Sequence, residues 1–287
     1  MKYLTKEWYD LCQRTGLHFG MRVHNGAHAH DEALYLRLYK RKEKEFVNMQ
    51  REVYDVDPRF MLEQDGTVLV PLHTFSSGDE ISEEDTIVYH MPSEEKARIQ
   101  KLIADYDARP PFDEIKCKQE FSRNMEWRCR EEAARLPREL FSQIADMRVF
   151  ALGYCTKDVL RELKKRSEEN ERNMKLVLDE FTKMQQAQHI PETILETFNF
   201  HDCKVTEWVS GQQVVIRLDT QGGFTAFNKV TFVAAEIIKQ EDHFVGSTWI
   251  YNELYRIDNG YEVHMLFAGK GMPELILRCH DIVIEKE

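Results

Sequence analysis

The spacing of apolar residues changes along the chain from a helical period to an alternating one. Before residue 190, apolar residues recur three or four positions apart, which is the spacing of a helix with one buried face. After residue 198 they alternate with polar residues, as in half-buried antiparallel strands. The pattern predicts an α+β protein with a mainly α-helical domain over residues 1–190 and an antiparallel β domain over 198–287. The β domain is expected to be a sandwich or a barrel-like module.

The clearest helix of the first part begins after Asp31, which is placed to cap it, and runs for about twenty residues. It is predicted to end before Pro58, because the residue ahead of proline avoids the helical region. Four further helices are expected over 93–108 with Ser93 as the cap, 112–136, 137–153 and 156–190. The last is expected as one helix, since it contains neither glycine nor proline. A short strand is expected over 67–70 and a short helix just before Phe198.

Six groups of alternating apolar residues predict the strands of the β domain. The strongest turn signal between them is Asn259–Gly260, because a two-residue hairpin turn requires residues that accept positive φ. The six groups are Val205 and Trp208; Val214, Ile216 and Leu218; Val230, Phe232 and Ala234; Trp249 and Tyr251; Val263, Met265 and Phe267; and Leu275, Leu277 and Cys279.

The stretch between the two predicted domains is apolar, unlike a flexible linker, which is rich in glycine, serine or other polar residues. Its apolar residues are Ile190, Pro191, Ile194, Leu195, Phe198 and Phe200. These side chains need a surface to cover them, so we expect them to be buried and the two parts to be packed together. A partner-binding groove is then expected along the seam between the helical and β parts.

Composition narrows the classes of function. The chain has 287 residues and a net charge of −11, so general binding to nucleic acid or to anionic membranes is not expected. The sequence shows no signal peptide, no membrane-spanning stretch and no paired cysteine motif among its six cysteines. We therefore expect a cytoplasmic protein with reduced thiols. The sequence does not set the oligomeric state.

Two charged runs are expected to be solvated. Asp79–Glu95 contains seven acidic residues and neither lysine nor arginine, which predicts a loop or an exposed face. The basic run Arg37–Arg51 is interrupted by Glu43 and Glu45 and lacks the aromatic pattern of single-strand nucleic-acid binders. It predicts a solvated helix face.

The densest chemical cluster consists of His24, His28 and His30, with His18 six residues upstream. Imidazole is the commonest metal ligand, so this loop is a candidate site for zinc or another divalent transition metal. Its spacing matches neither His-Glu-x-x-His nor a Cys/His finger. The alternative is a solvent-exposed loop that leads into the helix capped by Asp31.

Other reactive residue types have an ordinary structural interpretation. His201–Asp202 introduces the β sequence and is expected to tie a turn to the backbone. Cys155 precedes a helix, which could lower its pKa, but a packed structural thiol is the favoured interpretation. His264 and His280 are expected on a solvent face or at satisfied edge positions. Lys270 lies between two glycines without the remaining features of a phosphate-binding loop, so a hairpin turn is predicted.

Three stretches of the chain resemble an uncharacterised domain-of-unknown-function family of Gram-positive bacteria. They are Met1–Tyr9, Ala145–Tyr154 and Phe200–Val205, and the resemblance extends over nearly the whole chain. It implies a bacterial cytoplasmic protein and brings no catalytic residues with it. The β part is also loosely similar to small β domains of bacterial immunity-type proteins, a likeness at the level of fold.

Two functions follow as hypotheses. The first is a non-enzymatic interaction or binding protein that presents a surface for a protein partner at the helical/β seam, because catalytic motifs are missing from the sequence. The alternative is a metal-dependent hydrolase built on His18, His24, His28 and His30, with an acidic residue as the base.

Overall fold

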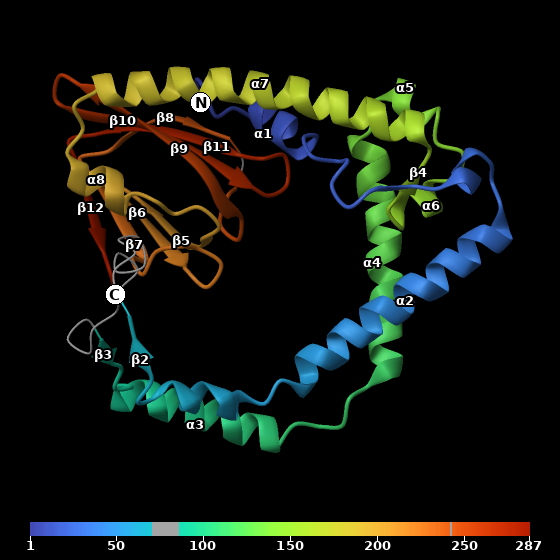
Figure 1. Cartoon of the computed structure of the whole chain (residues 1–287). Helices are drawn as coiled ribbons and strands as arrows, with labels where there is room; N and C mark the ends of the chain where they lie inside the picture. Colours follow the sequence, from blue (N-terminus) through green and yellow to red (C-terminus); the bar gives the residue numbers. More distant parts are fainter. Residues whose placement is uncertain (71–85, 242) are drawn as a thin grey trace. The chain divides into compact units, whose positions relative to one another are not determined.

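The structure is a computed structural model that describes residues 1–70, 86–241 and 243–287. The protein is α+β, as predicted, with helices in the first part of the sequence and antiparallel strands in the last (Figure 1). The chain divides into two compact units, each built from separate stretches. Unit 1 comprises Met1–His24, Arg135–Gln143 and Cys155–Glu287, and unit 2 comprises Asn25–Ala134 and Ile144–Tyr154.

Eight antiparallel strands form the sheet of unit 1 within the described part of the chain (Figure 1). They are β5 (Lys204–Ser210), β6 (Gln213–Asp219), β7 (Lys229–Val233), β8 (Glu236–Gln240), β9 (Thr248–Ile257), β10 (Gly260–Ala268), β11 (Glu274–Cys279) and β12 (Asp281–Glu285). The predicted turn joins β9 to β10. Its Gly260 has a φ of 140°, and a Cβ there would collide with the backbone of Cys279, so glycine is required.

Two pairs of strands are bent continuations of each other. β8 follows β7 after two residues and β12 follows β11 after one, and the two bent strands pair antiparallel along their length. The bend contains Ala234, with a φ of 49°, and His280 donates its backbone N–H there to the carbonyl of Val233 at 2.9 Å. Because β5 also pairs with β9, the ladders return to their starting point and the sheet closes on itself. Closure leaves little of the sheet with unpaired edge groups.

One apolar core fills the closed sheet and includes the stretch that was predicted to be buried. Phe198 and Phe200 pack against the ring of Trp249, with centroid distances of 5.6 and 5.1 Å, and all three are buried. Ile194 and Leu195, on the short helix α8 (Glu192–Thr197), lie against the same core. This confirms the prediction that these residues are covered and do not form an exposed linker.

A buried carboxylate holds the first residues of the chain to the sheet. Glu253 on β9 is fully buried and accepts the backbone N–H groups of Lys2, Tyr3 and Leu4 at 2.7, 2.8 and 2.7 Å. The hydroxyl of Tyr255 also donates to it, at 2.7 Å. Burial by itself raises the pKa of Glu253, but the donated hydrogen bonds outweigh it and the pKa is lowered. The carboxylate therefore stays charged and tethers the N-terminal segment.

The remaining elements of unit 1 are α1 (Lys6–Gln13), β1 (Arg22–Val23), α5 (Arg138–Phe141) and α7 (Lys157–Ala187). α7 is one helix of 31 residues, as predicted, and the hydroxyl of Thr156 caps it by accepting the N–H of Val159. The turn after α1 docks on α7, where the buried Ser167 accepts the N–H of Gly16 at 3.0 Å. Both helices share a unit with the sheet, so the units differ from the predicted domains 1–190 and 198–287.

Unit 2 is mainly helical. Its elements are η1 (Asn25–His28), α2 (Glu32–Asp55), η2 (Pro58–Gln64), β2 (Val68–Leu69), β3 (Ile87–Val88), α3 (Ser93–Asp107), α4 (Glu114–Arg135) and α6 (Met147–Ala151), with β4 (Tyr154–Cys155) at its end. Asp31 caps α2 by accepting the N–H of Leu34 at 3.0 Å, and α2 ends ahead of Pro58. Both features were predicted.

Two of the predicted helices differ from the observed ones. The helix expected over 137–153 is divided into α5 and α6, because the side chain of Asp146 accepts the N–H of Arg148 at 2.9 Å and begins a new helix. Ser93 is the first residue of α3 rather than its cap; Pro92 precedes the helix and no side chain caps it.

The sheet contains two strands beyond the six predicted groups, β8 and β12. Every residue of β8 is exposed, so this strand carries no alternating signal in the sequence. In the acidic run, residues 79–85 lie outside the described residues, and Ile87–Val88 forms β3.

Candidate functional site

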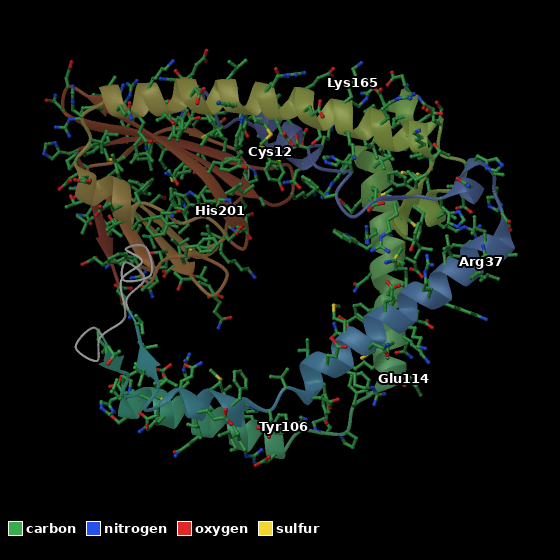
Figure 2. The ribbon with its side chains drawn as sticks, in the orientation of Figure 1. Cys12, Arg37, Tyr106, Glu114, Lys165 and His201 are labelled. Atoms are coloured by element: carbon green, nitrogen blue, oxygen red, sulfur yellow. The ribbon has the colours of Figure 1, made fainter. Side chains whose placement is uncertain are left out.

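An apolar groove lies on unit 2 between α2 and α4. Its volume is about 640 Å³, and it is lined by Tyr35, Leu36 and Tyr39 of α2, by Ser122, Met125, Glu126, Cys129 and Arg130 of α4, and by Arg148 of α6. Figure 2 shows the side chains of these helices, with Arg37 labelled on α2 and Glu114 at the beginning of α4. The lining residues lie mostly three or four positions apart, so each helix presents a continuous row of side chains to the groove.

A packed apolar cluster joins α2 to α4 beside the groove, and Met125 belongs to both. Leu34 and Leu38 of α2 are buried together with Phe121 and Met125 of α4. The ring of Tyr39 lies edge-on against Phe121, with centroids 5.1 Å apart. Such a cluster fixes the spacing of the two helices, because close-packed side chains resist displacement. The groove is therefore preformed.

Leu36 contrasts with its neighbour Leu34 on α2. It lies only two residues away, yet it is 47% exposed whereas Leu34 is 3% exposed. Leu36 is therefore an apolar side chain that lines the groove and is open to solvent.

Arg148 closes one end of the groove and is held by two carboxylates. Its guanidinium donates to Glu32 at 2.8 Å and to the buried Asp146 at 2.9 Å, and it lies over the ring of Tyr35 at 4.2 Å. His30 lies beside the same guanidinium, with its Nε2 3.1 Å from a nitrogen of Arg148. These contacts join α2 and α6 and orient the Tyr35 ring along the groove.

The electrostatics of this end follow from burial and pairing. Burial raises the pKa of Asp146, but the hydrogen bonds from Arg148 outweigh it, so the pKa is lowered and the carboxylate is charged. The hydrogen bonds that Arg148 donates to Asp146 and Glu32 raise the pKa of its guanidinium above the ordinary value. Burial also raises the pKa of Tyr35, which stays a neutral phenol in the groove wall.

Two groups at the rim are not neutralised within unit 2. The side chains of Arg130 and Glu126 on α4 make no ion pair or hydrogen bond with any residue that the structure describes. Arg148 is already satisfied by two carboxylates, so Arg130 is the cation available to a bound molecule.

The thiol in the groove is not activated. Burial raises the pKa of Cys129, whose thiol is 3.8 Å from the carbonyl of Met147. A protonated thiol is a poor nucleophile. The remaining lining consists of apolar and polar side chains of α2, α4 and α6.

The predicted metal ligands do not converge in the structure. His28 Nδ1 lies 2.5 Å from the carbonyl oxygen of Asn25, His30 faces Arg148 and Asp146, and the ring of His18 packs on Phe19. His24 hydrogen-bonds through its backbone N–H to the carbonyl of Cys155. Within the described ranges, no group of three or more His, Cys, Asp or Glu side chains is arranged to hold a metal ion.

The other candidates are structural. Cys155 is buried, and burial raises its pKa to about 11, which confirms the packed thiol rather than the activated one. His201 lies 3.0 Å from the carboxylate of Asp202, whose φ of 66° marks the predicted turn. The prediction for His264 was wrong: it is 4% exposed, inside unit 1, with its Nε2 2.9 Å from Glu262. His280 is exposed at the bend between β11 and β12.

Sequence reasoning did not identify Tyr35 or Arg148 as site residues. Arg148 lies in the Ala145–Tyr154 stretch, which was singled out only for its resemblance to a family. Its neighbour Asp146, two residues upstream, was the available signal, because the aspartate of Asp-x-Arg can cap a helix and pair with the arginine two residues later. The partner Glu32 is 116 residues away in sequence and could not be assigned from spacing.

Comparison with known proteins gives one match. The model of a family described as "Protein of unknown function (DUF4085)" matches residues 95–276. The matched stretch begins in α3, ends in β11 and includes the α4 and α6 sides of the groove. No curated protein and no solved structure matches the chain. None of the described helices is long and apolar enough to cross a membrane.

Proposed function

The chain belongs to the DUF4085 family, and we propose that it is a binding protein that holds a helix of a partner protein in the groove between α2 and α4. The observation that carries this proposal is the pairing of a preformed apolar groove with an exposed Leu36 at its rim. The partner helix would have an apolar stripe with an acidic residue toward Arg130 and a basic residue toward Glu126, because these two rim side chains have no partner among the described residues.

The helical/β seam of unit 1 is a weaker site for the same role. A pocket of about 280 Å³ lies there between the N-terminal segment and β8, β10 and β11. Its charged side chains already pair with each other: Lys6 with Glu241, and Lys239 with both Glu241 and Glu274. A partner would have to break these pairs, whereas the groove of unit 2 needs no such exchange.

The setting that we propose is the reduced cytoplasm of a bacterial cell. All six cysteines are free thiols, and three of them, Cys155, Cys203 and Cys279, are buried. Free thiols without a partner cysteine suit a reducing compartment.

The test is photo-cross-linking from the groove, with a matched position outside it. A photoreactive residue at position 36 is compared with one at position 102, because Leu36 and Leu102 lie on helices of the same unit and are 47% and 42% exposed. We expect position 36 to cross-link a protein that position 102 does not, through a segment with an amphipathic helical sequence. A synthetic peptide of that segment should bind the purified chain.

Leu36→Glu should weaken peptide binding about tenfold or more, since it places a charge in the apolar wall against the apolar stripe of the helix, whereas Leu102→Glu should leave it unchanged. The proposal is wrong if positions 36 and 102 capture the same proteins, if the captured segment has no amphipathic helical sequence, or if Leu36→Glu binds the peptide as well as the unchanged chain.

A further inference from the structure

Unit 1 contains a second hollow, separate from the helix groove. It has a volume of about 370 Å³ and lies where α1, the turn after it, α5 and α7 meet. This size falls within the range of about 300 to 1,000 Å³ that is usual for small-molecule sites. Its walls mix apolar and charged side chains, which distinguishes it from the apolar groove of unit 2.

The apolar part of this pocket is aliphatic. Leu11 and Leu17 come from α1 and the turn that follows it, Leu140 from α5, and Leu163 from α7. Leu140 and Leu163 are buried, so they form a fixed surface. This surface suits a branched aliphatic side chain, which would gain free energy by leaving water.

The charged part carries both signs. Arg14 and Arg166 are the cations, and Glu7, Asp10 and Glu169 are the anions. Such a mixture disfavours a polyanion, which the three carboxylates would repel, and a polycation, which the two guanidiniums would repel. It is complementary to a small molecule that carries one charge of each sign.

Several of these charges are not used within the protein. Arg166 pairs with Glu162 at 2.8 Å through its Nε. Arg14, Asp10 and Glu169 form no ion pair or hydrogen bond through their side chains with any residue that the structure describes. Asp10 and Arg14 lie four residues apart around the end of α1, a spacing that commonly gives a pair, yet they do not meet here.

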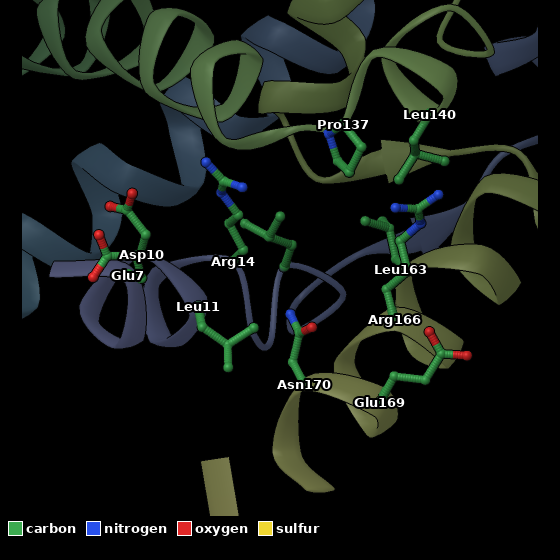
Figure 3. A pocket seen from close by; sticks show the side chains of 11 residues that line it. Glu7, Asp10, Leu11, Arg14, Pro137, Leu140, Leu163, Arg166, Glu169 and Asn170 are labelled. Carbon is green, nitrogen blue, oxygen red and sulfur yellow. The ribbon is translucent and has the colours of Figure 1, made fainter. Parts of the chain in front are cut away.

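Each side of the pocket carries both signs. Figure 3 shows Glu7, Asp10 and Arg14 on one side of the view and Arg166 and Glu169 on the other, with both guanidinium groups directed toward the end where Pro137 and Leu140 lie. The ammonium and carboxylate groups of an α-amino acid are bonded to one carbon, so a carboxylate at Arg14 would place the ammonium group toward Asp10 on the same side.

From this arrangement we infer that unit 1 binds a small zwitterion with an aliphatic side chain, of the size of a free amino acid or a dipeptide. Arg14 binds its carboxylate, Asp10 binds its ammonium group, and the leucine surface covers its side chain. The inference is independent of the helix groove, since no residue is shared between the two hollows.

The test uses calorimetric titration of the full chain with L-leucine and with the dipeptide Leu-Leu. N-acetyl-L-leucine, which lacks the ammonium, and L-leucinamide, which lacks the carboxylate, are the matched analogues. We expect leucine or the dipeptide to bind and each analogue to bind about tenfold or more weakly, because each loses one charge-assisted hydrogen bond. Stronger binding of the dipeptide than of leucine would identify a peptide terminus as the ligand.

Two variants link the binding to named side chains. Arg14→Met should weaken leucine binding about tenfold and leave leucinamide binding unchanged. Asp10→Asn should weaken leucine binding about tenfold and leave N-acetyl-leucine binding unchanged. Arg161→Met is the control, because Arg161 is exposed on α7, pairs with Asp158 and does not line the pocket. Far-ultraviolet circular dichroism checks that each variant is folded.

Three results would overturn the inference. The first is no heat of binding with either ligand up to about 10 mM, because this excludes affinities of physiological use. The others are analogues that bind as well as leucine, and an Arg14→Met variant that binds leucine as tightly as Arg161→Met does.

Discussion

In unit 1, Trp249, Phe232 and Phe267 are completely buried inside a closed sheet, whereas in unit 2, α2 buries Leu34 and leaves Leu36 half exposed. The sheet returns its hydrogen-bond ladders to their starting point and uses Glu253 to tie down the N-terminal segment. α2 and α4 pack on one side only, and their other side is the groove. Both units leave some large apolar side chains exposed. In unit 1 those side chains, such as Phe224 and Leu176, lie outside the closed core, whereas in unit 2 the exposed Leu36 lines a groove.

The largest effect that this comparison predicts is the loss of the buried clamp of unit 1. Glu253→Ala leaves three backbone N–H groups and the Tyr255 hydroxyl without their acceptor. We expect the free energy of unfolding to fall by about 3 kcal/mol or more, because each buried donor that is left unpaired costs about 1 kcal/mol or more.

Urea unfolding followed by tryptophan fluorescence measures this loss. Tyr255→Phe is the control, since it removes one donor to Glu253 and should cost about 1 kcal/mol. Equal losses in the two variants would show that the backbone clamp adds nothing to the Tyr255 contact.

Unit 2 offers a matched pair of leucines on one helix. Leu34→Ala removes a buried side chain and should lower the free energy of unfolding by about 2 to 5 kcal/mol, whereas Leu36→Ala should change it by about 0.5 kcal/mol or less. Circular dichroism at the helix band during urea unfolding compares the two variants. A large loss with Leu36→Ala would mean that the groove wall is part of the core, which would remove the basis for a docking site.

The elements that the sequence predicts well are those governed by near neighbours. Asp31 and the N–H that it caps are three residues apart, and the Asn259–Gly260 turn joins adjacent strands, so their chemistry is visible in a short window. The uninterrupted α7 is predicted for the same reason.

The features that the sequence does not predict depend on distant partners. Glu253 meets Lys2 across 251 residues, and Arg148 meets Glu32 across 116. From sequence alone, a glutamate in a strand is predicted to face solvent, because the hydrogen-bond donors that surround it in the fold are not known. Likewise, the exposed β8 becomes part of the sheet only because β11 and β12 provide its ladder and its bend. The pockets combine residues from several such elements, so neither could be composed from sequence spacing.

The pH dependence of stability should reflect the buried groups of unit 1. Burial lowers the pKa of His264 below its ordinary value of 6.5, although its contacts with Glu262 and Glu253 act in the opposite direction. A lowered pKa means that the unfolded chain takes up the proton first, so stability is fully present above pH 6.5 and declines as the pH falls below it. The slope is at most about 1.4 kcal/mol per pH unit for this one group.

Glu253, whose pKa is also lowered, adds a second decline below its ordinary value of 4.5. Unfolding free energies measured between pH 7.5 and 4 would separate the two ranges, and His264→Gln should flatten the upper one alone. If His264→Gln kept the full pH dependence of the unfolding free energy between pH 6.5 and 5, other residues would be responsible for it.

The smallest effect concerns the reaction rates of the thiols in the two units, and measuring it should leave stability unchanged. Burial raises the pKa of Cys155 in unit 1 to about 11, so about one molecule in a thousand carries its thiolate at pH 8, and the sulfur is also covered. Cys129 is only partly buried and lines the open groove of unit 2. A small thiol reagent at pH 8 should therefore modify Cys129 well before Cys155, as peptide mass spectrometry would measure, and both should react at similar rates in denaturing urea. If Cys155 reacted as fast as Cys129 in the native protein, unit 1 would open on the timescale of labelling, and the contrast between a closed unit and a receptive one would fail.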